Sequence, residues 1–147
     1  MSKSAVSKAG SGKSGKLPKL GRVLLVEDDA VLAMSLEYAL LSGGAEEVII
    51  CHTMQSTMEQ LEDGDRLDAI VLDVHLADRD DGWALAELVD MLGLKRPWIA
   101  FSTGSPGDIP KEIAQMGPIF EKPYDPEQLV RVMAAGRKRG LFSRLLR

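Results

Sequence analysis

Residues 67–73 constrain the fold most, because they form a short, nearly all-apolar run that ends on an aspartate. Residues 69–72 have the length and composition of a strand covered on both faces, as in a parallel sheet. Asp73 follows where this strand ends, and open α/β sheets place ligands and chemistry at the carboxyl edge of their strands. Asp73 is therefore either a candidate reactive carboxylate or an ordinary cap of the next turn, where aspartate is common.

The rest of the chain alternates strand-like and helix-like segments. Short apolar runs predict four further strands, and apolar residues three or four positions apart predict the helices between them. The predicted strands are residues 22–26, 47–52, 98–102 and 119–121, and the helices are marked by Leu32, Leu36, Ala39 and Leu40, by Met54, Met58 and Leu61, by Leu85, Leu88 and Leu92, by Ile109, Ile113 and Met116, and by Leu129, Val132 and Met133.

Alternating elements with short connections require parallel strands joined by right-handed crossovers. Five strands and five helices predict a flavodoxin-like, doubly wound α/β fold with strand order 2-1-3-4-5. The fourth helix follows a Gly- and Pro-rich loop at residues 103–107 and should have at most two turns. The last helix should begin at Asp125, a capping residue followed by Pro126 at the first helical position.

Charge divides the chain into an acidic middle and two basic ends. Residues 1–20 carry five lysines and no acid, residues 128–147 carry six Lys/Arg and no acid, and residues 21–127 hold all 22 acids against seven basic residues. We expect a disordered tail at 1–20, a folded domain at 21–139, and a basic extension at 140–147. We expect this extension to fray, with a continued helix or a small amphipathic contact as the alternatives.

These features also exclude several classes of protein. An acidic middle argues against specific nucleic-acid binding, and no apolar run approaches the roughly 20 residues of a membrane span. The single cysteine, Cys51, allows no internal disulfide, which together with an N-terminus lacking an apolar signal segment leads us to expect a cytoplasmic protein. Residues 10–16 look like a phosphate-binding P-loop, but neither register fits the motif and no strand precedes it.

The predicted strand order brings distant polar residues to one edge of the sheet. Strands 1 and 3 are neighbours in this order, so Glu27 and Asp28 should meet Asp73, and three such carboxylates repel one another unless a cation lies among them. Oxygen ligands at this edge suit Mg²⁺. Thr103 and Lys122 follow strands 4 and 5, and their hydroxyl and ammonium groups suit the oxygens of a transferred phosphoryl group. Aspartate can itself be the nucleophile, which gives an aspartyl phosphate.

Each of these residues also has an ordinary structural alternative. The acids could form a solvated first helical turn, Thr103 a loop hydroxyl and Lys122 a surface side chain. Their joint arrival at one edge of one predicted sheet favours a site.

With these residues, the chain resembles a response-regulator receiver domain of two-component signalling. The resemblance covers about residues 21–139, and its motifs occur in the expected order. They are Val26-Glu27-Asp28-Asp29, Val71-Leu72-Asp73, Asp81-Gly82, Phe101-Ser102-Thr103-Gly104 and Glu121-Lys122-Pro123-Tyr124.

The resemblance implies a stand-alone receiver that takes a phosphoryl group from a histidine kinase or a histidine phosphotransfer protein. Such a receiver signals to a downstream protein by direct contact or acts as a phosphate sink, and it catalyses only its own phosphorylation and slow dephosphorylation. It implies the following roles: Asp73 as phosphoacceptor, Asp28 as direct Mg²⁺ ligand, Glu27 as ligand through water, the backbone carbonyl of His75 as a further ligand, Thr103 as switch hydroxyl and Lys122 as phosphate contact.

The chain departs from the family pattern at the switch positions. Ser102 is a second candidate for the switch hydroxyl, although Gly104 favours Thr103, since small residues follow the hydroxyl in this family. The family's switch aromatic, three residues before the lysine, is here Ile119, and Phe120 should point to the other face of the strand. Residues 101–104 are similar to a receiver subgroup with Phe-Ala-Thr-Gly that also lacks this aromatic.

A second hypothesis from another class is a small phosphohydrolase of the haloacid-dehalogenase kind, which also uses Asp, Thr/Ser and Lys. Such enzymes require a second acid two residues after the nucleophile, where this chain has His75. Their metal-binding acids also come late in the chain, whereas Glu27 and Asp28 come early.

Overall fold

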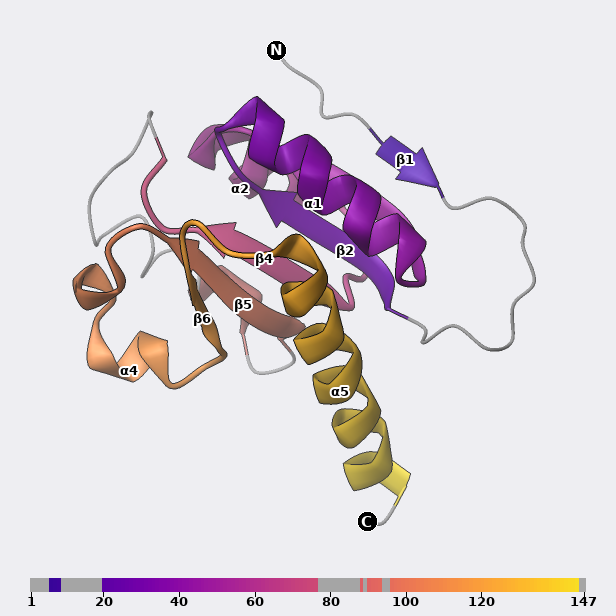
Figure 1. The fold of residues 1–147 in the computed structure, drawn as a ribbon. Helices are drawn as coiled ribbons and strands as arrows, with labels where there is room; N and C mark the ends of the chain where they lie inside the picture. Colours follow the sequence, from indigo (N-terminus) through magenta and orange to yellow (C-terminus); the bar gives the residue numbers. More distant parts are fainter. Residues whose placement is uncertain (1–5, 9–19, 77–87, 89, 94–95, 146–147) are drawn as a thin grey trace.

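The computed structural model describes residues 6–8, 20–76, 88, 90–93 and 96–145 (Figure 1). Strands and helices alternate along most of the chain, with one additional strand near the N-terminus. The strands are β1 (Val6–Lys8), β2 (Gly21–Val26), β3 (Ala45–Cys51), β4 (Ala69–Asp73), β5 (Trp98–Thr103) and β6 (Ile119–Glu121), the helices are α1 (Ala30–Ser42), α2 (Met54–Asp63), α4 (Lys111–Ala114) and α5 (Pro126–Leu145), and a 3₁₀ turn, η1, spans Pro106–Asp108.

These strands form one sheet in the order β1-β3-β2-β4-β5-β6. The five strands from β2 to β6 are parallel, and their order confirms the predicted 2-1-3-4-5 arrangement. The prediction of a disordered tail is wrong at Val6–Lys8, because this segment pairs antiparallel with β3, with Val6 opposite Ile49. An edge strand presents unpaired backbone groups, and an extended segment can satisfy them whatever its own apolar content.

The sheet separates two hydrophobic clusters, because successive side chains along a strand point to opposite faces. Val71 of β4 and Ala100 of β5 belong to the cluster on the face covered by α1 and α5, here called the α1/α5 face. Leu72 and Phe101, one residue further along the same strands, belong to the cluster packed with residues of α2 and α4, here called the α2/α4 face. Alternate residues along a strand therefore contact different helices, and we call the face to which a strand residue points its strand parity.

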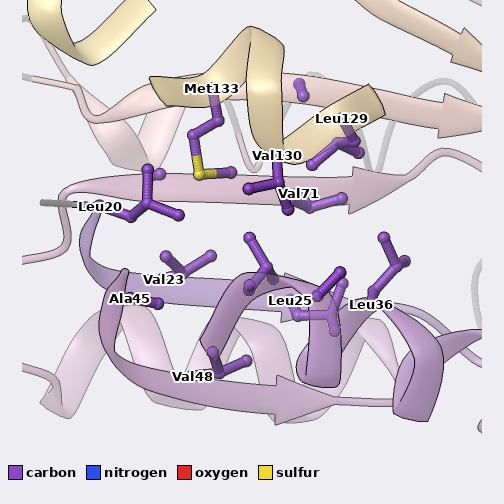
Figure 2. Close-up of a cluster of buried hydrophobic side chains, with 14 of the residues drawn as sticks. Leu20, Val23, Leu25, Leu36, Ala45, Val48, Val71, Leu129, Val130 and Met133 are labelled. Atoms are coloured by element: carbon purple, nitrogen blue, oxygen red, sulfur yellow. The ribbon is translucent and has the colours of Figure 1, made fainter. Parts of the chain in front are cut away.

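The core on the α1/α5 face holds α1 and α5 in place (Figure 2). Asp29 caps α1 by accepting hydrogen bonds from the N–H groups of Val31 and Leu32. Leu36 is fully buried on the inner side of α1, and Met133 is fully buried on α5. Since both side chains pack in one cluster with the β2 and β4 residues, the two helices share a single buried layer.

A polar cluster at the opposite, amino edge of the sheet ties α5 to the strands. Asp68 accepts a hydrogen bond from the Arg22 N–H at 2.9 Å, and its Oδ1 lies 3.4 Å from Arg137 Nη2 of α5. Arg22 also donates from Nε to Glu47 Oε1 at 2.7 Å. These contacts fix α5 relative to β2 and β4, far along the helix from its first turn.

The fourth helix, the C-terminal extension and the third helix agree with the prediction to different degrees. The fourth helix is short as predicted, with α4 covering Lys111–Ala114. Residues 140–145, which we expected to fray, instead continue α5 to Leu145, the alternative of a continued helix. Of the predicted third helix, Leu88 and residues 90–92 are helical, whereas Leu85 and the Asp81-Gly82 motif lie outside the described residues. Among the described helices none is long and apolar enough to cross a membrane.

Candidate functional site

The candidate site is built at the carboxyl edge of β2 and β4. Glu27 directly follows β2, and its N–H donates to the Cys51 carbonyl at 3.0 Å, which continues the sheet by one more residue. Asp73 is the last residue of β4 and pairs in register with Ser102 of β5. Glu27 is fully buried and Asp73 is 2% exposed. By strand parity both carboxylates lie on the α1/α5 face.

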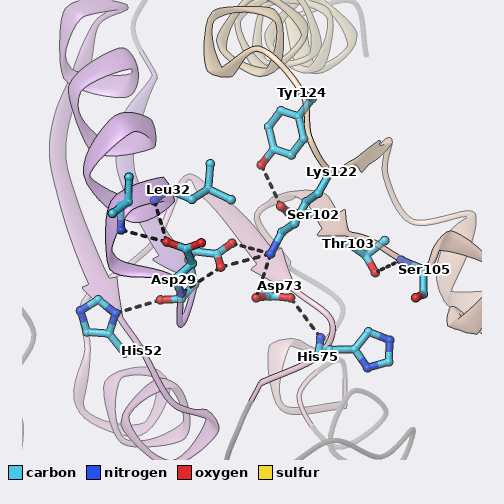
Figure 3. Close-up of polar contacts among 12 residues, drawn as sticks. Asp29, Leu32, His52, Asp73, His75, Ser102, Thr103, Ser105, Lys122 and Tyr124 are labelled. Carbon is cyan, nitrogen blue, oxygen red and sulfur yellow. Dashed lines mark hydrogen bonds and ion pairs between the residues drawn. The ribbon is translucent and has the colours of Figure 1, made fainter.

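Lys122 lies between these two buried acids (Figure 3). Its Nζ is 3.1 Å from the Glu27 carboxylate and 3.2 Å from Asp73 Oδ2. The other oxygen of Asp73, Oδ1, accepts a hydrogen bond from the His75 N–H at 3.1 Å. The loop after β6 therefore supplies a cation to carboxylates that belong to two other strands.

Burial and mutual repulsion perturb the protonation of both acids. Burial, reinforced by the negative charge of Asp73, raises the pKa of Glu27 from its ordinary 4.5 to about 7. Burial also raises the pKa of Asp73, although Lys122 opposes the shift. Burial alone would lower the pKa of Lys122, but the charges of Asp73 and Glu27 outweigh burial and raise it. One ammonium group thus only partly compensates two buried carboxylates, which leaves demand for a further cation.

The same edge offers a set of oxygen ligands for such a cation. Carboxylate oxygens of Glu27, Asp28 and Asp73 lie within 4.8 Å of one another, as the sequence predicted. Glu27 Oε1 is buried and has no hydrogen-bond partner, although it contacts the Lys122 ammonium. Asp28 is exposed, so an ion bound here could keep several waters, as Mg²⁺ prefers. These residues fit a hydrated divalent cation.

Two hydroxyl groups of β5 lie close to the acids but on different faces of the sheet. Ser102 and Thr103 are both fully buried. The Ser102 Oγ pairs with the Tyr124 hydroxyl at 2.8 Å, and strand parity places it on the same face as Asp73. The Thr103 Oγ1 accepts a hydrogen bond from the Ser105 N–H at 2.9 Å, which stabilises the start of the following loop.

The aromatic residues near the site follow the predicted orientation. Ile119 is 37% exposed, whereas Phe120 is 8% exposed and points to the α1/α5 face, which confirms the expectation that Phe120 points to the other face of the strand. Phe120 instead contacts the ring of Tyr124, with ring centroids 5.5 Å apart. A role for Tyr124 was not predicted from the sequence, although its position two residues after Lys122 was a usable signal.

Two histidines make contacts that the sequence did not predict. The Nδ1 of His52 lies 2.8 Å from the Glu27 carbonyl and so fixes the backbone at the end of β2. The Nε2 of His75 lies 3.0 Å from Asp108 Oδ2, which connects the loop after β4 to the η1 turn. The His75 imidazole therefore pairs with Asp108 of η1, whereas its N–H binds Asp73.

Comparison with solved structures identifies the fold as that of response-regulator receiver domains. The chain is similar to the signal receiver domain of a protein from Vibrio parahaemolyticus, with a TM-score of 0.69, 22% identity, and coverage of 85% of this chain and 95% of that one. The CheY-like receiver domain from Methylobacillus flagellatus gives a TM-score of 0.65 and 21% identity over 80% and 98% of the two chains. The CheY-like domain from Methanospirillum hungatei JF-1 gives 0.67 and 21% over 82% and 96%. No protein-family model matches the chain, and no curated protein sequence does.

Proposed function

We propose that residues 21–139 form a response-regulator receiver domain in which Asp73 accepts a phosphoryl group. The observation that carries this proposal is the convergence of Glu27, Asp28, Asp73 and Lys122, from three separated parts of the chain, at one carboxyl edge. Similar receiver domains among solved structures support the same interpretation, as does the demand for a cation at the site. We further propose a cytoplasmic location, with a histidine kinase or a histidine phosphotransfer protein as phosphodonor.

The residues at the site can perform such a transfer without a further nucleophile. An Asp73 carboxylate oxygen would attack the phosphorus of a phosphohistidine, forming the P–O bond while the P–N bond breaks and the imidazole leaves with the electron pair. Mg²⁺ held by Asp28 and Asp73, with Glu27 acting through water and the His75 carbonyl as a further ligand, would neutralise charge on the phosphoryl oxygens. Lys122, already 3.2 Å from Asp73, would contact one of those oxygens, and Thr103 would supply a hydroxyl donor.

An open groove between α1 and the start of α5 suits a phosphodonor. Met34 and Tyr38, four residues apart on α1, are 67% and 75% exposed and offer apolar contact surface. They line a groove of about 420 Å³ together with Asp125 and Glu127 at the start of α5. We propose that a helix of the phosphodonor docks here, with apolar residues in the groove and basic residues against the two acids.

A phosphate mimic tests this function directly. Beryllium fluoride with Mg²⁺ should form an adduct at Asp73 and shift the amide NMR signals of Asp73, Thr103 and Lys122. The Asp73→Asn variant should lose these shifts, and Asp63→Asn, which removes an exposed acid at the end of α2, should keep them. Unchanged spectra of the wild-type protein at saturating mimic would refute the proposal.

The phosphohydrolase alternative receives no support from the site. It requires an acid two residues after Asp73, and the residue there, His75, pairs with Asp108 on another loop. Turnover of a generic phosphate ester by the wild-type protein, lost in Asp73→Asn, would favour that alternative.

A further inference from the structure

We infer that Tyr124 is a positioning residue that links occupancy of Asp73 to the start of α5 through its hydrogen bond with Ser102. This inference rests on the proposed function, because it concerns what happens when a phosphoryl group or its mimic is bound at Asp73. It assigns a role to a side chain that the transfer itself does not use. Figure 3 shows the two hydroxyls meeting beside Lys122, on the side away from Thr103.

Ser102 lies next to the phosphoacceptor Asp73, on the neighbouring strand β5. Ser102 pairs in register with Asp73 on the neighbouring strand, and the two side chains share the α1/α5 face. Adjacent strands are about 4.8 Å apart, so oxygens added to the Asp73 carboxylate come within reach of the Ser102 hydroxyl. Thr103 has the opposite parity, and its Oγ1 accepts a hydrogen bond from the Ser105 N–H, which leaves its own proton for the donor role proposed above.

The Ser102 hydroxyl can donate to only one acceptor at a time, either Tyr124 or an anion at Asp73. Ser102 carries a single hydroxyl proton, and in the 2.8 Å contact with Tyr124 either oxygen can be the donor. A hydrogen bond to an anionic oxygen is roughly twice as strong as one between neutral groups. When an anion is bound at Asp73, the Ser102 proton should therefore turn to the anion, and Tyr124 must either donate to Ser102 or lose the bond.

Tyr124 contacts the elements that would respond to a change in its hydroxyl partner. The Tyr124 ring contacts Phe120 of β6 and packs against the core shared by α1 and α5. The next residue, Asp125, accepts a hydrogen bond from the Glu127 N–H at 3.0 Å and so caps the first turn of α5. A change in the hydroxyl partner of Tyr124 therefore acts on both β6 and the start of α5, a route that the exposed Ile119 cannot provide.

A purely structural role for Tyr124 makes a different prediction. If its hydroxyl only satisfied a buried serine, Tyr124→Phe would destabilise the fold slightly and leave the response to the phosphate mimic unchanged. A coupling role requires that the same variant still binds the mimic at Asp73 while the response of α5 is reduced. The two roles can thus be separated by measuring binding and propagation in one experiment.

The experiment uses the full chain labelled with ¹⁵N and, in a second sample, with 3-fluorotyrosine. The protein has two tyrosines, and Tyr38, which is 75% exposed, is the internal reference for Tyr124. With Mg²⁺ and beryllium fluoride we expect the ¹⁹F signal of Tyr124 to move and that of Tyr38 to stay. In Tyr124→Phe we expect the amide shifts at Asp73 and Lys122 to persist, and those of residues 127–129 to fall to less than half of the wild-type change.

Two further variants complete the test. Tyr38→Phe should leave every shift as in the wild type. Ser102→Ala should still form the adduct, and its Tyr124 ¹⁹F signal should no longer respond. An adduct at Asp73 combined with wild-type shifts of residues 127–129 in Tyr124→Phe would overturn the inference and leave the proposed function intact. The absence of any adduct in the wild-type protein would overturn both.

Discussion

Replacing Glu27 with glutamine tests the electrostatic balance of the site. Glu27 is fully buried, and burial together with the charge of Asp73 raises its pKa from 4.5 to about 7. A carboxyl group whose pKa is raised by folding stabilises the folded state while it is protonated. This contribution is fully present below about pH 4.5 and is lost as the pH rises through about 7. A glutamine side chain cannot ionise, so Glu27→Gln should lack this loss.

The size of the effect follows from the two pKa values. Each factor of ten in protonation corresponds to about 1.4 kcal/mol, so a rise from 4.5 to about 7 gives a pH-dependent loss on the order of 3 kcal/mol. Relative to the wild-type protein, Glu27→Gln should therefore gain up to that much stability between pH 5 and pH 8. The gain should shrink when Mg²⁺ is added, because a cation that binds the wild-type carboxylates stabilises the wild-type protein by mass action.

Urea unfolding at pH 5, 6, 7 and 8 in the presence of a chelator measures this difference. The control is Glu62→Gln, which removes an exposed carboxylate of α2 and should give the same difference from the wild type at every pH. If the difference between Glu27→Gln and the wild type were also constant from pH 5 to pH 8, the reasoning about a destabilised buried carboxylate would be refuted.

Three further changes should alter stability in ways that urea or thermal unfolding can measure. Lys122→Met leaves two buried acids without their cation and should cost about 3 kcal/mol at pH 8 and less at pH 5; equal costs would contradict the ion-pair account. Leu36→Ala empties a fully buried position and should cost about 2–5 kcal/mol, so a cost below about 1 kcal/mol would be inconsistent with its burial. Gly117→Ala directs a methyl group into the Ile99 carbonyl oxygen and should destabilise the protein, whereas Gly107→Ala, whose methyl group meets open space, should change stability by less than about 0.5 kcal/mol; equal effects would contradict the packing at Gly117.

The fold was predictable wherever a segment's own pattern decides its structure. The apolar run before Asp73 and the capping residue Asp125 each carry a local signal, and both lie where that signal placed them. The strand at Val6–Lys8 was not predictable, because its pairing depends on the free edge of β3 and not on its own composition. The continuation of α5 past Gly140 was only an alternative to fraying in the sequence, since a single glycine lowers helix propensity by only about 1 kcal/mol and does not decide between the two.

The candidate site shows the same division. Strand order alone brought Glu27, Asp28 and Asp73 together, because the carboxyl ends of neighbouring parallel strands must meet. The contact between Ser102 and Tyr124 was missed, since it depends on which face each side chain takes and on the path of the loop after β6. Topology can be predicted from a sequence more readily than the pairing of individual hydroxyl groups.

Because α5 is long, a small tilt at its first turn becomes a larger displacement at its far end. The helix has 20 residues, which corresponds to about 30 Å, and it runs from the turn beside Tyr124 past the sheet toward the C-terminus (Figure 1). A tilt of about 5° at its first turn that also releases the Arg137 contact with Asp68 would displace the far end by about 3 Å, provided that the helix stays straight. A small rearrangement at the first turn of α5 thus becomes a displacement that a spectroscopic probe attached near residue 145 can detect.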